Sequence, residues 1–252
     1  MEITLEKKTL KLPKRLRLIC LGASESGKST FFKNILKHRR TLLSTIYKGI
    51  IYCSPNYAFH KITEKDKEFQ EEIKKYTEGL KVVFIDYLPT IEQLEEIKPD
   101  PNDPYLIIID DFEELAYTSP IILNIFTRLS THYNLDVMLS VHTSNTDGKK
   151  NFFQTLLQNS NAIILFDAFL SAPSISKIGL MLFRGKKHFL LRTMNSLAKF
   201  VNYNHAYLAI LTERNYFNSR FPIRSNIFAF TEDSFEKNMG YLFIEHPDYK
   251  KL

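Results

Sequence analysis

The sequence predicts an α/β fold, a doubly wound, mostly parallel sheet with helices on both faces. Short, continuously apolar segments are typical of strands that are buried on both faces. Segments with helical periodicity lie between them, and this alternation indicates parallel strands joined by helices. A glycine-containing turn joins the first apolar segment to the first helical one. With 252 residues, 44% of them hydrophobic, the chain can bury one substantial core.

Six apolar segments are expected to form the strands of this sheet. Most of them end at turn signals or at acidic residues, as strands commonly do. The expected strands cover residues 16–21, 49–53, 82–85, 105–109, 137–141 and 162–166. Helices with apolar residues three and four positions apart are expected between them, over residues 30–37, 62–76, 91–97 and 121–129. The proline-rich residues 99–104 are expected to form a surface loop.

The two ends of the chain give weaker patterns. The first twelve residues alternate roughly as a strand does, and Pro13 interrupts them. Beyond residue 171 the pattern predicts two more helices and two more strands, at residues 175–183, 189–200, 206–211 and 227–230. We expect a single domain over residues 1–252, in which residues 171–252 pack on a core formed by residues 15–170.

Composition and charge bound the classes of protein to which the chain can belong. The net charge of +6 is compatible with a polyanionic partner but does not identify one. No apolar segment approaches the ~20 residues that span a bilayer, and the N-terminus lacks the apolar stretch of a signal peptide. Cys20 and Cys53 both lie in expected strands, so we expect buried thiols in a reducing compartment rather than a disulfide or a metal site. These observations predict a soluble, intracellular protein without a membrane span.

A phosphate-binding motif occupies the turn after the first strand. The motif G-x-x-x-x-G-K-[ST] is matched by Gly22-Ala23-Ser24-Glu25-Ser26-Gly27-Lys28-Ser29, which Thr30 follows. Its glycines let successive backbone N–H groups point at phosphate oxygens, and the helix N-terminus adds partial positive charge. Lys28 is expected to reach the β- and γ-phosphates, and the Ser29 hydroxyl to hold Mg²⁺. Against the alternative of a turn without a ligand, the setting between strand and helix favours a nucleoside triphosphate site.

Two carboxylates end the expected strand at residues 105–109. In a parallel sheet the C-terminal end of each strand points at the ligand crevice, so Asp110 is expected beside the Mg²⁺ that Ser29 holds. Asp111 is the candidate that activates the attacking water, with Glu113 and Glu114 as alternatives one turn later. A structural alternative is that these acids only cap the helix that follows.

Polar residues also follow the strand at residues 137–141. Either His142 or Thr143 is placed to sense the γ-phosphate and hold the attacking water, unless the residue there only caps the next loop. Residues 146–150 then form a basic loop, in which Lys149 and Lys150 are candidates for contact with DNA or with a neighbouring subunit. Solvent exposure without a ligand is the alternative for that loop.

The segment at residues 216–224 mixes aromatic residues with Arg220 and Arg224. Such mixtures occur at nucleic-acid surfaces, at subunit interfaces that supply an arginine finger, and in segments that simply pack on a domain. We expect packing and one functional arginine.

The order of the motifs narrows the class of nucleotide-binding protein. Two expected strands lie between the phosphate-binding loop and the acidic pair, which suits the branch in which an extra strand separates the two motif strands. The guanine-selecting sequence N-K-x-D is absent, so ATP is the expected nucleotide.

Together these motifs resemble the FtsK–HerA superfamily of DNA-pumping ATPases, and within it the viral genome-packaging ATPases of the poxvirus and Polinton-virus type. The matching segments are residues 22–31, 50–55, 106–115, 136–145 and 158–166, with Asn159 at the position of an asparagine that precedes a core strand in that family. The resemblance covers roughly residues 15–185. It implies a P-loop ATPase of the RecA- and FtsK-like branch that forms a homo-oligomeric ring, moves double-stranded DNA and docks on capsid proteins. The host cytoplasm or nucleus, or the virion, would be its location.

The chain departs from that family at three places. The family commonly has glutamine where His142 stands, and an arginine in the region where this chain has Gln154. The trans-acting cation would then come from Arg128, Lys149 or Lys150. Glu25 places a carboxylate inside the phosphate-binding loop, and it is expected to face outward.

Two functions of other classes remain open at this point. A nucleotide kinase has a similar length and the same loop, but it needs an arginine-rich lid and an acceptor pocket. A nucleotide-switched scaffold that has lost hydrolysis would bind ATP without turnover. A DNA translocase or helicase that does not package genomes is a further alternative within the class of DNA-moving ATPases.

Overall fold

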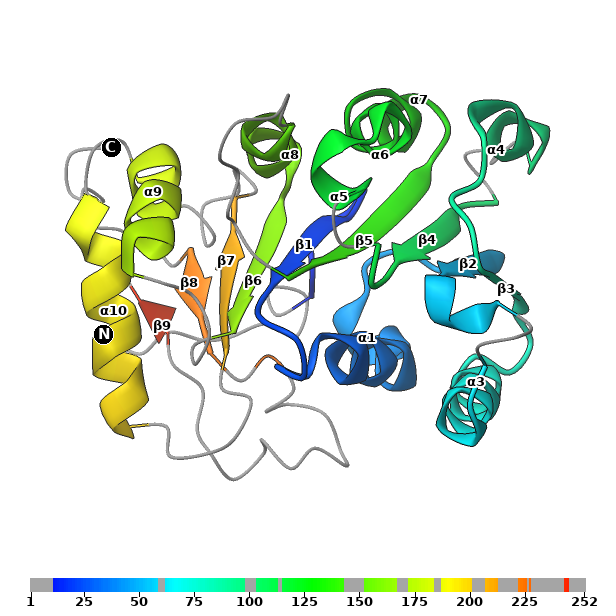
Figure 1. Ribbon diagram of the computed structural model, residues 1–252, viewed down its shortest axis with the longest axis horizontal. Coiled ribbons are helices and arrows are strands. Elements are labelled where there is room, and N and C mark those ends of the chain that lie inside the picture. The colour runs from blue at the N-terminus through cyan, green and yellow to red at the C-terminus, as the bar shows by residue number, and fades with distance from the viewer. Residues whose placement is uncertain are drawn as a thin grey trace.

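The computed structural model describes residues 11–58, 62–97, 103–112, 115–142, 152–166, 172–183, 187–200, 207–212, 222–225, 227 and 243–244. Within these residues nine strands form one sheet, in the order β3-β2-β4-β5-β1-β6-β7-β8-β9 (Figure 1). The strands are β1 (Arg17–Leu21), β2 (Gly49–Cys53), β3 (Lys81–Ile85), β4 (Tyr105–Ile109), β5 (Leu135–Val141), β6 (Ala162–Phe166), β7 (Tyr207–Leu211), β8 (Ile223–Arg224) and β9 (Phe243–Ile244). Neighbouring strands from β3 to β6 pair in parallel, whereas β7, β8 and β9 pair antiparallel.

Helices cover both faces of the sheet, which confirms the predicted fold class. In Figure 1 helices α1 and α3 lie below the sheet and α4 to α8 lie above it. The helical segments are α1 (Lys28–Lys37), α2 (Arg39–Leu42), η2 (Pro55–Tyr57), α3 (Glu64–Tyr76), α4 (Ile91–Ile97), α5 (Leu115–Thr118), α6 (Pro120–Asn124), η3 (Ile125–Leu129), α7 (Ser130–His132), α8 (Phe153–Asn159), α9 (Ala172–Leu182) and α10 (Lys187–Phe200).

Alternate residues of each central strand enter two separate hydrophobic clusters, one on each face. On β1, Leu18 and Cys20 face α1, whereas Ile19 and Leu21 pack in the cluster that contains α6, η3 and α8. All four side chains are fully buried. This burial on both faces explains why the strands read as continuous apolar runs instead of alternating ones.

Strand β1 precedes the phosphate-binding loop and β4 precedes the two aspartates. One strand, β5, separates them in the sheet, as the order of the motifs predicted. Strand β5 pairs with β1 on one side and with β4 on the other. The register aligns Ile109 with Leu139 and Leu21 with Val141. The residues that follow β1, β4 and β5 therefore meet at one edge of the sheet.

Several predicted elements have other bounds in the structure. Helices α1, α9 and α10 begin two or three residues earlier than predicted. The helix predicted at residues 121–129 consists of α6, a π-helical turn (η3) and α7, and Pro120 starts it after the cap residue Ser119. Strand β5 begins at Leu135, two residues earlier than predicted. Helix α3 begins after the capping box of Thr63 and Asp66, so Ile62 lies outside it.

The last part of the chain was predicted least well. Strands β8 and β9 were not predicted, because two residues carry no readable period. Ile227 is described but lies in a turn, and the rest of the strand predicted at residues 227–230 lies outside the described residues. The alternating segment at residues 1–10 lies outside them too. Within the described residues, no helix combines the length and apolarity that crossing a membrane requires.

The edge of the sheet opposite the motif loops contains a buried hydrogen bond. Tyr47 donates its hydroxyl to Asp136 over 2.6 Å, and both residues are buried. Burial raises the pKa of the Asp136 carboxyl, while the Tyr47 hydrogen bond lowers it. Without the Tyr47 hydroxyl, the buried Asp136 carboxylate would lose a hydrogen bond that offsets the cost of its burial.

We expect Tyr47→Phe to lower the free energy of unfolding by about 1–3 kcal/mol, the usual cost of a buried acceptor that loses its donor. Urea denaturation measures the change, with Tyr87→Phe as the matched control on a half-exposed tyrosine. Equal stability of Tyr47→Phe and the control would show that the hydrogen bond adds nothing to the fold.

Candidate functional site

The phosphate-binding loop joins β1 to α1 in a conformation that depends on its glycines. Gly27, the residue before α1, has φ of 97°, and Glu25 also adopts a left-handed conformation with φ of 60°. A Cβ on Gly22 would lie 2.5 Å from Ser26 Oγ and 2.9 Å from Phe166 Cβ. The loop therefore needs glycine at residue 22 for close approach and at residue 27 for backbone conformation. Glu25 is exposed, but it also lines the cavity described below, so it does not simply face outward as expected.

Lys28 is the cation inside this loop. Its ammonium group donates to the carbonyl oxygens of Gly22 and Ala23 over 2.9 and 2.6 Å. Only 4% of the residue is exposed, and burial lowers the pKa of the amine, while the carboxylates of Asp111 and Asp110 oppose that shift. The lysine is thus held over the loop by weak carbonyl acceptors, which phosphate oxygens can replace.

Asp110 carries a buried carboxylate at the end of β4. Tyr52 donates its hydroxyl to Oδ2 over 2.8 Å, while Oδ1 is buried and has no hydrogen-bond partner among the described residues. Burial and the negative charge of Asp111 raise the pKa of Asp110, and the Ser140, Ser29 and Tyr52 hydroxyls lower it. A buried oxygen without a donor suits a cation ligand.

The donor set near Asp110 fits Mg²⁺. Mg²⁺ in nucleotide sites is commonly held by one or two protein oxygens, with substrate phosphates and waters in the other positions. Ser29 and Asp110 supply a hydroxyl and a carboxylate of that kind. No group of three or more histidine, cysteine, aspartate or glutamate side chains within the described residues forms a site for a metal bound by protein alone.

Asp111 has a strained backbone and a fixed side chain. Its φ is 61°, a conformation that costs a residue other than glycine about 1–2 kcal/mol. Its backbone N–H donates to Ser140 Oγ over 3.0 Å. Oδ1 lies 2.6 Å from His142 Nε2, and Asn56 donates its amide to Oδ2 over 3.1 Å. Residues after β2 and β5 thus hold the carboxylate of Asp111 from two sides.

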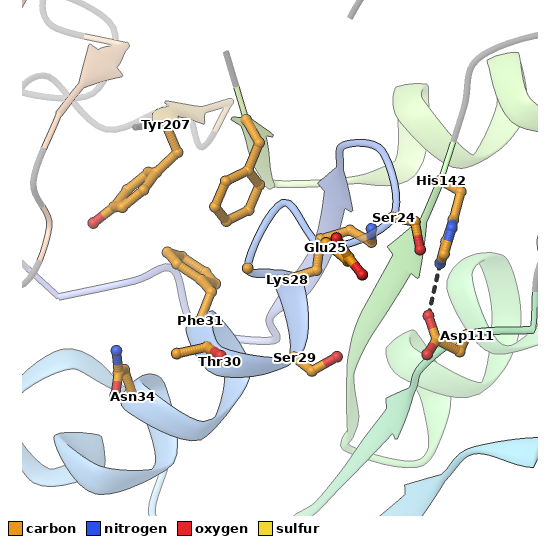
Figure 2. Close-up of a pocket in the computed structure, with 12 residues that line it drawn as sticks. Ser24, Glu25, Lys28, Ser29, Thr30, Phe31, Asn34, Asp111, His142 and Tyr207 are labelled. Carbon is orange, nitrogen blue, oxygen red and sulfur yellow. Dashed lines mark hydrogen bonds and ion pairs between the residues drawn. The ribbon is translucent and has the colours of Figure 1, made fainter. Parts of the chain in front are cut away.

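One cavity of about 450 Å³ connects these groups (Figure 2). Figure 2 shows Asp111 and His142 on one side of Lys28 and Ser29, and Phe31, Asn34 and Tyr207 on the other. The lining residues are Ser24, Glu25, Gly27, Lys28, Ser29, Thr30, Phe31, Asn34, Asp111, His142, Phe166 and Tyr207. The structure therefore brings together the loop, Asp111 and His142 around one cavity. Asp110 is buried and does not line the cavity, but it is close enough to Ser29 for that hydroxyl to lower its pKa.

Other residues predicted for the site lie away from this cavity or outside the described part of the chain. Asn159 ends α8 before β6 starts, at the edge opposite the loop, and its amide donates to the Thr155 carbonyl. Gln154 in α8 and the exposed Arg128 in η3 do not line the cavity. Glu113, Glu114, Thr143, Lys149, Lys150 and most of residues 216–224 lie outside the described residues. Arg224 is described and is buried in β8.

Sequence reasoning missed three residues that hold the two aspartates. Tyr52 in β2, Asn56 in η2 and Ser140 in β5 all contact or orient Asp110 or Asp111. In the sequence, Ser54-Pro55-Asn56 indicates only a turn that ends the strand at residues 49–53. The available signal was that β2 and β5 flank β4, so polar residues near their C-terminal ends point to the same edge.

We expect Asp110→Asn to raise the melting temperature of the nucleotide-free protein by a few degrees. A raised carboxyl pKa means that the charged form destabilises the fold at pH values above its ordinary pKa, and the neutral amide removes that penalty while still accepting from Tyr52. The gain should shrink as pH falls through the pKa of Asp110, because the wild-type carboxyl then becomes neutral. Calorimetric melting at several pH values measures this, and an unchanged or lower melting temperature at neutral pH would contradict it.

Comparisons with known proteins give little beyond the fold. No protein-family model matches the sequence, and no curated protein matches it. Among solved structures, one match is the genome packaging NTPase B204 from Sulfolobus turreted icosahedral virus 2, in complex with ATP-gammaS. It is 14% identical, its TM-score is 0.47, and the match covers 79% of this chain and 94% of that chain.

Proposed function

We propose that this chain binds Mg²⁺–ATP at the phosphate-binding loop and hydrolyses it. The observation that carries the proposal is the convergence on one cavity of the Lys28 loop and the Asp111–His142 pair, with the buried Asp110 carboxylate beside Ser29. The loop amides and Lys28 hold the phosphates, and Ser29 and Asp110 hold the metal ion. Mg²⁺, when bound, neutralises charge on the phosphate oxygens.

Asp111 orients the attacking water in this mechanism. Its carboxylate reaches the cavity and is fixed by Asn56 and His142, so its position is set before the nucleotide arrives. Each carboxylate oxygen has two lone pairs and one contact within the described residues, so Asp111 can accept from the water while it keeps Asn56 and His142. His142 lines the cavity beside Asp111 and is the partner nearest to that water in this proposal.

We further propose that hydrolysis drives movement of double-stranded DNA by a homo-oligomeric ring, most specifically the packaging of a viral genome into a capsid. The support is the sequence resemblance described above and the net charge of +6. Lys149 and Lys150 are the proposed DNA-contacting residues. In the sequence they follow β5 and the cavity-lining His142, so we propose that contact with DNA is coupled to the state of the nucleotide through this strand.

An ATP-binding switch without turnover is the second candidate. The observation that favours it is that Asn56 and His142 each already contact one oxygen of Asp111 and so compete with a water for that carboxylate. A nucleotide kinase is less well supported, because no arginine lines the described part of the cavity.

ATP turnover by the full chain, with and without double-stranded DNA, tests the proposal. We expect DNA to stimulate turnover, Lys28→Ala to abolish it, and Lys149→Ala with Lys150→Ala to remove the stimulation while leaving the basal rate unchanged. Stimulation that survives the double change would exclude these lysines as the DNA contacts. ATP binding without turnover under all conditions would support the switch instead.

Asp111→Asn separates binding from chemistry. The amide is close in size, its oxygen can accept from Asn56 and its NH2 group can donate to His142 Nε2 when the other ring nitrogen carries the proton, but it cannot act as a base. We expect the turnover number to fall about 10²- to 10⁴-fold, the usual contribution of a general base, with Mg²⁺–ATP affinity within about threefold of wild type. Single-turnover kinetics and calorimetry measure the two quantities.

Asp103→Asn, at a surface ion pair with Lys48, is the matched control for the loss of one carboxylate. A turnover number for Asp111→Asn equal to that of this control would remove Asp111 from the mechanism.

A further inference from the structure

The cavity continues past the phosphate-binding loop along one face of α1. Gly27, Thr30, Phe31 and Asn34 line it, and their spacing of three and four residues places them on the same side of the helix. The helix rises about 9 Å from Lys28 to Asn34. The cavity therefore has a second end, on the side of Lys28 away from Asp111 and His142 (Figure 2).

Three aromatic rings form an apolar wall at this second end. Phe31 lies edge-to-face with Tyr207 and with Phe166, at centroid distances of 5.0 and 6.0 Å. Phe166 ends β6 and is paired in register with Tyr207, which starts β7. The Tyr207 hydroxyl also accepts from the backbone N–H of Ile227 over 3.0 Å. Phe31, Phe166 and Tyr207 are each at most 3% exposed, so packing holds their rings in place and only their edges reach the cavity.

Polar groups at the rim of this wall come from α1. Asn34 is partly exposed and offers one amide donor and one amide acceptor to the cavity, and Thr30 adds a hydroxyl. Lys28 is the only lysine or arginine that lines the described part of the cavity, and it is held at the phosphate loop. A carboxamide pairs with the donor and acceptor of adenine N6 and N7, whereas guanine O6 and N7 are both acceptors and favour arginine or lysine.

We propose that this end of the cavity is the base subsite, and that it selects adenine. The base lies against the wall of Phe31, Phe166 and Tyr207, and Asn34 reads its edge. The inference rests on the proposed nucleotide site, since the phosphates must occupy the loop for the base to reach the wall. It assigns to Asn34 and Phe31 a role in the choice of nucleotide, separate from the role of Lys28 in phosphate binding.

Dissociation constants of the full chain for three probes, all with Mg²⁺, test this subsite. The probes are ATP, GTP and inorganic tripolyphosphate, which has the phosphates but no base. We expect wild type to prefer ATP to GTP by about tenfold to hundredfold, as one bidentate base contact provides. Asn34→Leu should reduce that preference to within about threefold, and Phe31→Leu should weaken ATP and GTP together by about tenfold.

Tripolyphosphate separates this inference from the proposed function. Its affinity should be unchanged in Asn34→Leu and Phe31→Leu and should be lost in Lys28→Ala. Phe69→Leu removes a ring of the same core cluster that does not line this cavity, and it should leave all three affinities unchanged. Asn34 is partly exposed, so Asn34→Leu should fold normally. The test therefore still holds if Phe31→Leu, which changes a buried residue, fails to fold.

Two results would overturn the subsite. If the ATP-to-GTP ratio of Asn34→Leu equals that of wild type, Asn34 does not read the base. If tripolyphosphate binds as tightly as ATP to wild type, no base subsite exists although the phosphate site does. Failure of wild type to bind either tripolyphosphate or ATP would overturn the proposed function together with the subsite.

Discussion

The parallel register of β4, β5 and β1 is the constraint on which the rest of the site depends. Because the three strands run in one direction and pair without a slip, their C-terminal ends lie at one edge of the sheet. The phosphate loop, the two aspartates and His142 each follow one of these strands directly. A shift of one residue in any pairing would turn a strand's side chains to the opposite face and remove its residue from the site.

Hydrogen bonds across this edge fix the loops as well as the strands. Gly22 donates its backbone N–H to the Val141 carbonyl, and Asp110 donates to the Cys53 carbonyl. The ladder thus continues one residue beyond the strands before the chain turns. The strained backbone of Asp111 follows at once, and the continued ladder holds that strain in place.

The buried carboxylates at the two edges of the sheet differ in their hydrogen-bond and charge partners. At the edge away from the loop, Asp136 accepts from Tyr47 and lies near Arg17, so its charge has local compensation. At the loop edge, Asp110 has Tyr52 on one oxygen and no hydrogen-bond partner among the described residues on the other. If Mg²⁺ binds to Asp110 as proposed, it would offset the cost of this buried charge and stabilise the fold by binding to the native state.

The sequence by itself determined the fold class, the strands from β1 to β7, and the loop with the aspartates that follow β4, because apolar runs and a glycine-dependent turn are local signals. It did not determine β8 and β9, which exist only through pairing with β7, nor the π-helical turn inside the helix predicted at residues 121–129. The tertiary structure alone decided that Tyr52, Asn56 and Ser140 hold the aspartates, and that Phe166 and Tyr207 face Phe31. These residues lie far apart in the chain, and only the strand order brings them to the cavity.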